Sequence, residues 1–138
     1  PRCARLLCCD TAAAAVSLAQ TRLQGFAHAQ VEQRRLPAQW PGGRFELIVL
    51  SEWCYYLDHD DLCLLVEQIL AALTDDGQVL ACHWRPAIDG CPQTAEQVHQ
   101  VLHQRLGMSR LAQVADSDFL LDLWSRESAS VAHLEGLR

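Results

Sequence analysis

Polar side chains that directly follow apolar runs are the first candidates for chemistry in this sequence. Asp10 follows the run Arg5–Cys9, and Ser51 and Glu52 follow the run Phe45–Leu50. Runs that are apolar almost throughout are typical of strands buried on both faces of a parallel sheet, and such sheets bind ligands just beyond the carboxyl ends of their strands. These positions therefore predict a ligand site at one edge of a sheet.

Asp10 also precedes a stretch rich in helix formers, which gives its carboxylate a specific use. A carboxylate there can accept hydrogen bonds from both hydroxyls of a ribose, while the N–H groups that begin the helix face the rest of the ligand. Two alternatives stay open: nicotinamide-dinucleotide enzymes use the same device, and an Asp before a helix is also a common cap. Glu52 has a similar alternative, as the cap of the helix that follows it.

His83, Trp84 and Arg85 end a third apolar run. An imidazole has an unperturbed pKa near ~6.5, so His83, or Glu52 in its place, could accept a proton as a general base. A buried, hydrogen-bonded His83 is the alternative. Arg85 could bind a carboxylate or phosphate of a substrate, or face solvent.

The histidines and cysteines give little support for a metal ion. His99 and His103 are four residues apart and could share a metal, but no Glu follows the first His as it does in zinc proteases. None of the seven cysteines forms a Cys-x-x-Cys pair. We therefore predict no metal site, and we expect structural, reduced thiols.

The regular elements that position these residues follow from apolar periodicity. We predict strands over 5–9, 28–33, 45–50 and 78–84, helices over 12–23, 62–73 and 94–106, and a final hairpin of strands 108–114 and 118–124. Thr11 is the expected cap of the first helix, Asp60 or Asp61 of the second and Thr94 of the third. The segment Asp75-Asp76-Gly77 is predicted to be a tight turn.

Bulk composition narrows the function classes. A chain of 138 residues, half of them apolar, is long enough for one domain with a substantial core. The net charge of -6 and the lack of a basic run argue against a surface that binds nucleic-acid phosphates. All eleven basic residues are Arg, which excludes a Lys nucleophile. Without a bilayer-length apolar stretch or a signal-peptide pattern, we expect a cytoplasmic protein that binds no membrane.

Several segments, taken in order, resemble the class I S-adenosylmethionine-dependent methyltransferases. The similar segments are Arg5-Leu-Leu-Cys-Cys-Asp10 for the second strand of that fold, Val31-Glu-Gln-Arg-Arg-Leu-Pro37 for the third, Phe45-Glu-Leu-Ile-Val-Leu-Ser-Glu52 for the fourth and Leu73-Thr-Asp-Asp-Gly77 for the turn into the fifth. The pairs Ser51-Glu52 and Tyr55-Tyr56, with His83-Trp84-Arg85, are most similar to the nodulation-type N-methyltransferases (methyltransferase type 12). The implied fold is an α/β, Rossmann-like sheet, mostly parallel with a C-terminal antiparallel edge hairpin, in a single domain over 1–138.

The resemblance implies S-adenosylmethionine as the cofactor and methyl transfer to a small polar acceptor, with N-methylation expected. Asp10 would hold the ribose, with Thr11 and Ala12 beside the sugar and adenine. Gln33 would accept a hydrogen bond from the adenine amino group, and Arg34 would offer its backbone N–H. The other implied contacts are Leu50 and Ser51 with the methionine part of the cofactor, and Glu52, Tyr56, His83, Trp84 and Arg85 with the acceptor.

One part of the family pattern has no counterpart in the sequence. Relatives bind the methionine end of the cofactor with a glycine-rich loop after the first strand, and Gly42-Gly43 precedes the fourth strand and cannot replace that loop. We therefore expect a truncated chain, with the first strand, its loop and its helix, roughly 30 to 50 residues, outside this sequence. Because the first strand is central in this fold, two sheet halves with unpaired edges would be left.

Such a chain would bind the cofactor poorly, unless self-association or a partner supplies the strand. An alternative of another class is a degenerate methyltransferase-like interaction module without cofactor binding. A nicotinamide-dependent dehydrogenase is a third possibility, but its glycine fingerprint is equally absent and the terminal hairpin favours a methyltransferase.

Overall fold

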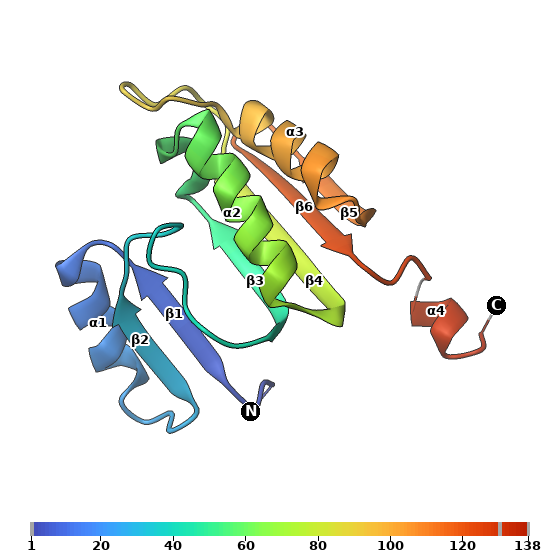
Figure 1. Cartoon of the computed structure of the whole chain (residues 1–138), viewed down its shortest axis with the longest axis horizontal. Helices are drawn as coiled ribbons and strands as arrows, with labels where there is room; N and C mark the ends of the chain where they lie inside the picture. The colour runs from blue at the N-terminus through green and yellow to red at the C-terminus, as the bar shows by residue number, and fades with distance from the viewer. Residues whose placement is uncertain (1, 130, 138) are drawn as a thin grey trace. The chain divides into compact units, whose positions relative to one another are not determined.

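The computed structural model describes residues 2–129 and 131–137 and alternates strands with helices (Figure 1). Pro1, the first residue of the expected linker, lies outside the described residues. The elements in order are β1 (Leu6–Asp10), α1 (Ala13–Leu23), β2 (Ala29–Gln33), β3 (Phe45–Ser51), the 3-10 turn η1 (Cys54–Tyr56), α2 (His59–Ala72), β4 (Leu73–Trp84), α3 (Ala95–Leu106), β5 (Ser109–Ala115), β6 (Phe119–Ser125) and α4 (Val131–Leu134).

These elements fall into two compact units, residues 1–41 and 42–138. The first unit is a β–α–β arrangement in which β1 and β2 pair in parallel, with Leu6 opposite Ala29 and Asp10 opposite Gln33. A parallel pair needs a crossover connection, and α1 provides it. The last residues of both strands therefore lie side by side at one edge of this unit.

The second unit contains a four-stranded sheet in the order β3-β4-β6-β5. Strands β3 and β4 are parallel, whereas β6 runs antiparallel to both β4 and β5. The predicted mixed α/β sheet with an antiparallel hairpin at its edge is thereby confirmed. Among the described residues, β1–β2 and the four-stranded sheet are separate sheets.

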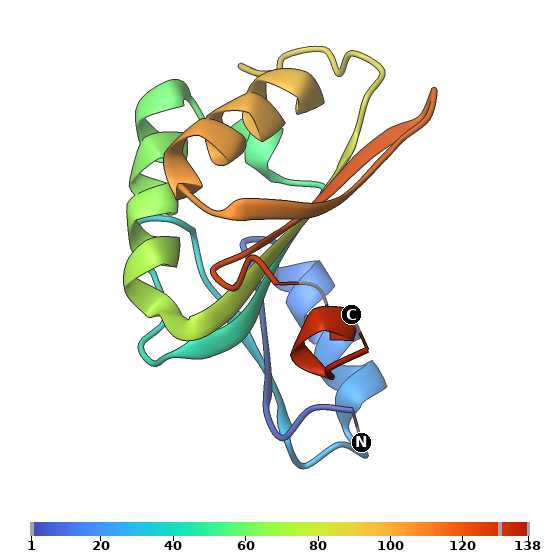
Figure 2. The same ribbon diagram turned by 90° about the vertical axis from the view of Figure 1, so that its right-hand side faces the viewer.

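The core of the second unit lies between its sheet and the helices α2 and α3, which cover the same face (Figure 2). The α2 face that buries Leu62, Leu65 and Ile69 repeats every three or four residues, as an amphipathic helix requires. The opposite sheet face is more open, because the side chains of Leu47 and Val49 on β3 are 51% and 53% exposed.

Two of the three expected helix caps differ in the structure. Ala12, not Thr11, is the N-cap of α1, and it makes no side-chain cap bond. Asp58, not Asp60 or Asp61, caps α2. The sequence does not show which of several neighbouring acidic residues is the N-cap, because this depends on the φ and ψ of each residue.

Thr94 is the cap of α3, as predicted. Its hydroxyl accepts from the N–H of Gln97, whose side chain accepts in turn from the Thr94 N–H. This reciprocal pair is a capping box.

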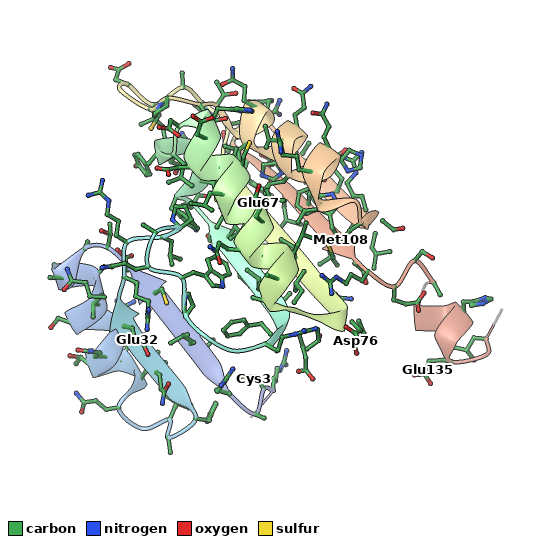
Figure 3. All side chains as sticks on the ribbon, viewed as in Figure 1. Cys3, Glu32, Glu67, Asp76, Met108 and Glu135 are labelled. Atoms are coloured by element: carbon green, nitrogen blue, oxygen red, sulfur yellow. The ribbon has the colours of Figure 1, made fainter. Side chains whose placement is uncertain are left out.

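The predicted tight turn at 75–77 is wrong, because these residues belong to β4 (Figure 3 labels Asp76). Phe45 pairs with Leu73 and Leu47 with Gln78, so residues 74–77 form an irregular, bulged part of the strand. Gly77 is needed there, since a Cβ on it would lie 2.7 Å from Leu73 Cδ2. The Arg126 guanidinium binds the carbonyl of Thr74 at 3.0 Å and that of Leu70 at 2.6 Å, which ties the bulge to the end of α2.

Candidate active site

Asp10 and Gln33 form the polar end of the β1–β2 pair. They are direct cross-strand partners, and both are exposed. Oδ1 of Asp10 accepts from the N–H of Ala12 at 2.7 Å, whereas Oδ2 accepts from none of the described residues. The Gln33 amide nitrogen donates to the carbonyl of Thr11 at 3.0 Å, which leaves its amide oxygen as the outward acceptor. The edge therefore presents two side-chain acceptors beside the start of a helix.

Arg34 lies next to this pair, but its backbone N–H is not free for the cofactor as expected. Its backbone N–H donates to the carbonyl of Asp10 at 2.9 Å, so this N–H already has an acceptor within the protein. The bond extends the β1–β2 ladder by one step and fixes the chain direction after Gln33.

Glu52 directly follows β3 and has an unusual backbone. Its φ of 61° places a non-glycine residue in the left-handed region, which costs of the order of 1 kcal/mol or more and is enriched at functional sites. One carboxylate oxygen, Oε2, accepts from the Tyr55 hydroxyl at 2.9 Å and from the Trp84 N–H at 3.0 Å. These two donors hold the carboxylate in place. The left-handed backbone at Glu52 therefore orients an exposed carboxylate that has a fixed position.

The two residues before Glu52 have different surroundings. Leu50 is only 2% exposed and packs in the core, so its backbone is the part that can approach a ligand. Ser51 is exposed and lies opposite Cys82 at the carboxyl ends of β3 and β4. Ser51 thus lies at the carboxyl end of a strand in the second unit, as Asp10 does in the first.

Tyr55 and Tyr56, in η1, have opposite environments. Tyr55 is buried, and burial together with its bond to Glu52 raises the pKa of its hydroxyl well above the usual value, so this phenol stays protonated. Tyr56 is 59% exposed, with its ring 4.9 Å from that of Tyr55. Tyr56 is therefore free to meet a ligand, while Tyr55 orients the carboxylate.

A small cavity of about 110 Å³ is lined by residues that include Tyr55 and Trp84, the two donors to Glu52. The other lining residues are Arg85, Pro86, Ala87, Ile88, Cys91, Gln93, Thr94 and Ala95. The cavity is thus lined mostly by apolar residues, and Glu52 itself is not among the lining residues.

Arg85 lines the cavity but is bound elsewhere. Its Nε donates to Glu96 at 2.8 Å, and its guanidinium also donates to the carbonyl of Asp116. The bond from Arg85 lowers the pKa of the Glu96 carboxyl. Arg85 was predicted either to bind the substrate or to face solvent, and the geometry shows neither role directly. Its bonds connect β4 to α3 and to the β5–β6 turn.

His83 is fully buried, and both of its ring nitrogens have partners. Nε2 accepts from the Cys54 N–H at 3.3 Å, and Nδ1 lies 3.0 Å from Nε2 of His99. Burial and the neighbouring His99 lower the His83 pKa to about 3. This geometry favours the buried, hydrogen-bonded alternative for His83 and leaves Glu52 as the accessible proton acceptor.

Sequence reasoning assigned no site role to three residues of this region. Tyr55, His99 and Asp122 contribute directly to the arrangement, and Asp122 is completely buried. One signal was present: Asp122 stands in the apolar run Phe119–Trp124, at an inward-facing position of a strand, where an unpaired charge would be costly. Such a residue predicts a buried partner, although the sequence does not say which one.

The predicted absence of a metal concerned His99 and His103 above all. His99 bonds to His83 and Asp122, and His103 accepts from the Trp124 indole N–H at 3.1 Å. Within residues 2–129 and 131–137, no group of three His, Cys, Asp or Glu side chains is placed to hold a metal ion. In the same ranges, no helix is both long and apolar enough to cross a membrane.

Comparison with solved structures decides the family. A protein from Pseudomonas syringae assigned as a methyltransferase is 54% identical in sequence and has a TM-score of 0.79, with 90% of this chain and 74% of that chain covered. The chain belongs to the S-adenosylmethionine-dependent methyltransferases. No protein-family model matches the sequence, and no curated protein does.

A methyltransferase of lower identity shares the fold. The N-methyltransferase NodS from Bradyrhizobium japonicum WM9 is 24% identical, with a TM-score of 0.80 over 91% of this chain and 75% of that chain. A second structure of NodS, in complex with S-adenosyl-L-homocysteine, matches with a TM-score of 0.79 and is covered over 68% of its length. These two structures show that the chain shares the fold of NodS.

The residues of this methyltransferase fit its cofactor in the first unit. A ribose offers two hydroxyl donors and an adenine an amino donor, and the paired acceptors of Asp10 and Gln33 suit such groups. The open Oδ2 of Asp10 and the exposed amide oxygen of Gln33 lie on neighbouring strand ends, so one nucleoside could reach both.

Proposed function

We propose that this methyltransferase transfers a methyl group to an amine nitrogen of a small polar acceptor. The observation that carries the proposal is the exposed Glu52 carboxylate, which is held by the Tyr55 hydroxyl and the Trp84 N–H, two residues that also line a small cavity. A carboxylate attracts an ammonium group, and aromatic faces stabilise cations at close range. The name of NodS, an N-methyltransferase, agrees with this choice.

Glu52 has a definite task in this scheme. A protonated amine has no free electron pair, so the nitrogen must lose a proton before or during the substitution. An exposed carboxylate held by two donors can accept that proton, and a well-positioned nucleophile supplies most of the rate. Tyr56 and Trp84, which are 59% and 44% exposed, are proposed to contact the acceptor.

S-adenosylmethionine supplies an electrophilic methyl group when it is bound. We propose that Asp10 binds the ribose, with Thr11 and Ala12 beside it, and that Gln33 accepts from adenine. The backbone at Leu50 and Ser51 is proposed to contact the methionine part. The open acceptor atoms at the end of the β1–β2 pair support this assignment.

The test combines binding and turnover. Calorimetric titration with S-adenosylmethionine measures binding, and the appearance of S-adenosylhomocysteine in the presence of small primary amines, with the corresponding alcohols as controls, measures transfer. We expect turnover with amines and not with alcohols. Turnover with alcohols alone would contradict N-methylation. Weak cofactor binding is already expected of a truncated chain, so the degenerate interaction module is favoured only if binding is still absent once the first strand and its glycine-rich loop are added.

We also propose a cytoplasmic setting and free small molecules as acceptors. All seven cysteines are free thiols, as a reducing compartment would keep them. The net charge of -6 supports a substrate other than nucleic acid.

A further inference from the structure

Three buried side chains connect the centre of the second unit to the turn beside Glu52. Asp122 Oδ2 lies 2.6 Å from His99 Nδ1, and His99 Nε2 lies 3.0 Å from His83 Nδ1. His83 Nε2 then accepts from the N–H of Cys54 at the start of η1. We call Asp122, His99 and His83 the histidine network. They come from β6, α3 and β4, so the network exists only in the folded chain.

The last bond of the network determines the direction of all the others. A backbone N–H can only donate, so His83 Nε2 must be unprotonated and its Nδ1 must carry the hydrogen. That hydrogen is donated to His99 Nε2, and His99 in turn donates from Nδ1 to the Asp122 carboxylate. Both rings are thus neutral Nδ1–H tautomers, in agreement with the lowered pKa values of His83 and His99 in this buried place.

Asp122 fixes the other end of the network. Its second oxygen, Oδ1, accepts from the Gln113 amide at 3.0 Å and from the Arg110 guanidinium at 3.4 Å. Every polar contact of this carboxylate is therefore with a donor, which suits an ionised group that can only accept. The network does not carry protons to the acceptor site, because it ends at a backbone amide that stays protonated.

What the network holds is the turn that carries Tyr55. Cys54 is 0% exposed, and the ring of His83 lies edge-on to the ring of Tyr55 at 5.5 Å. The Tyr55 hydroxyl in turn holds Oε2 of Glu52. We propose that Asp122, His99 and His83 are positioning residues, which orient η1 and through it the Glu52 carboxylate. This inference rests on the proposed role of Glu52.

Asp122→Asn is the decisive variant. If the Asn oxygen keeps its bonds with Gln113 and Arg110, its NH₂ group faces His99 and forces both rings into the Nε2–H tautomer. His83 would then present a donor to the N–H of Cys54, and that bond would be lost. Asp75→Asn is the matched control, because Asp75 is a fully exposed carboxylate bound to Arg44.

Long-range ¹H–¹⁵N correlation spectra of the imidazoles and amide exchange at Cys54 give the first readout, with no ligand required. We expect Nδ1–H tautomers for both rings in the wild type. In the Asp122→Asn variant we expect reversed tautomers and amide exchange at Cys54 that is faster by roughly tenfold or more. An Nε2–H tautomer in the wild type, or unchanged exchange at Cys54 in the variant, would overturn the network.

Turnover with the active amine gives the second readout. We expect a kcat roughly tenfold lower for Asp122→Asn, with an unchanged KM for S-adenosylmethionine. His99→Gln should keep most of the wild-type rate, because its amide can donate to Asp122 and accept from His83. His99→Leu can do neither and should lose it. Equal rates for these two folded His99 variants would show a packing role only.

The two readouts separate the two proposals. Confirmed tautomers with no turnover on any amine would disprove the proposed function and with it the catalytic part of this inference. Amine turnover with wrong tautomers would disprove the network alone.

Discussion

At the scale of single residues, Glu52 illustrates how backbone strain and side-chain contacts act together. Its left-handed φ of 61° is unfavourable for a residue with a side chain, yet the fold keeps it. The bonds from Tyr55 and from the Trp84 N–H offset that cost and fix one carboxylate oxygen. A residue that needs this much support is better explained by a task at the site than by packing.

Glu52→Gln tests this task. The amide keeps the size of the side chain and one acceptor oxygen, but it cannot take a proton. We expect kcat to fall roughly 100-fold, with the same melting temperature within a few degrees. Steady-state turnover with the active amine checks the rate, and Glu46→Gln, on the exposed part of β3, serves as the control. A Glu52→Gln variant with full activity would show that another group accepts the proton.

His83 predicts a pH dependence of stability. Its pKa is lowered from 6.5 to about 3 by burial and by His99, so between these pH values the unfolded chain binds a proton that the folded chain does not. The contribution is present above pH 6.5 and is lost as the pH falls towards 3, by up to ~1.4 kcal/mol per pH unit. Urea unfolding between pH 7 and 4 measures the slope.

The His83→Gln variant isolates this contribution to the slope. Its amide can accept from Cys54 and donate to His99, but it does not titrate. We expect a shallower fall of stability with decreasing pH than in the wild type. An identical slope would mean that other groups cause the pH dependence.

At the scale of elements, local sequence patterns predicted strands and helices better than they predicted turns. The β5–β6 hairpin and the capping box of α3 were predicted from local patterns, and the structure has both. Every residue of β5 is nevertheless exposed, so its side chains do not alternate in burial. The segment Asp75-Asp76-Gly77 has the composition of a turn, yet it lies in β4 because Phe45 pairs with Leu73 beyond it and Arg126 binds its carbonyls. Long-range pairing outweighed the local preference.

Gly77→Ala tests the bulge in β4. The added methyl would lie 2.7 Å from Leu73 Cδ2 and 3.0 Å from the Thr74 carbonyl oxygen, and Leu73 is fully buried. We expect a loss of about 1–3 kcal/mol in the free energy of unfolding. Gly25→Ala is the control, since a Cβ there meets nothing within 4 Å. Denaturant unfolding of both variants gives the comparison, and equal stability would contradict the tight contact.

At the scale of the whole molecule, the proposed cofactor contacts come from both units. Asp10 and Gln33 belong to residues 1–41, and Ser51 belongs to residues 42–138. A ligand that binds only the folded state stabilises each element that must stay folded for the ligand to remain bound. Protection by a ligand can therefore be measured for each unit by itself.

Hydrogen exchange with S-adenosylhomocysteine tests the contacts proposed for each unit. At saturating ligand we expect slower amide exchange in β1 and β2 and also at the end of β3. Asp10→Asn should weaken the protection of β1 and β2, because the ribose acceptor is changed. Protection confined to one unit would show that the other lacks a contact with the ligand.

The sequence by itself determined the family, the strand order along the chain and the polar residues at strand ends, because these depend on neighbouring residues and on motifs. Asp10, Gln33 and Glu52 were identified in this way. Only the tertiary structure decided that His83 is enclosed, that Arg85 is bound by Glu96, and that Asp122 and His99 complete a buried network. Those contacts join residues 11 to 29 positions apart in the chain, and side-chain burial and hydrogen-bond direction follow from packing that no local pattern records.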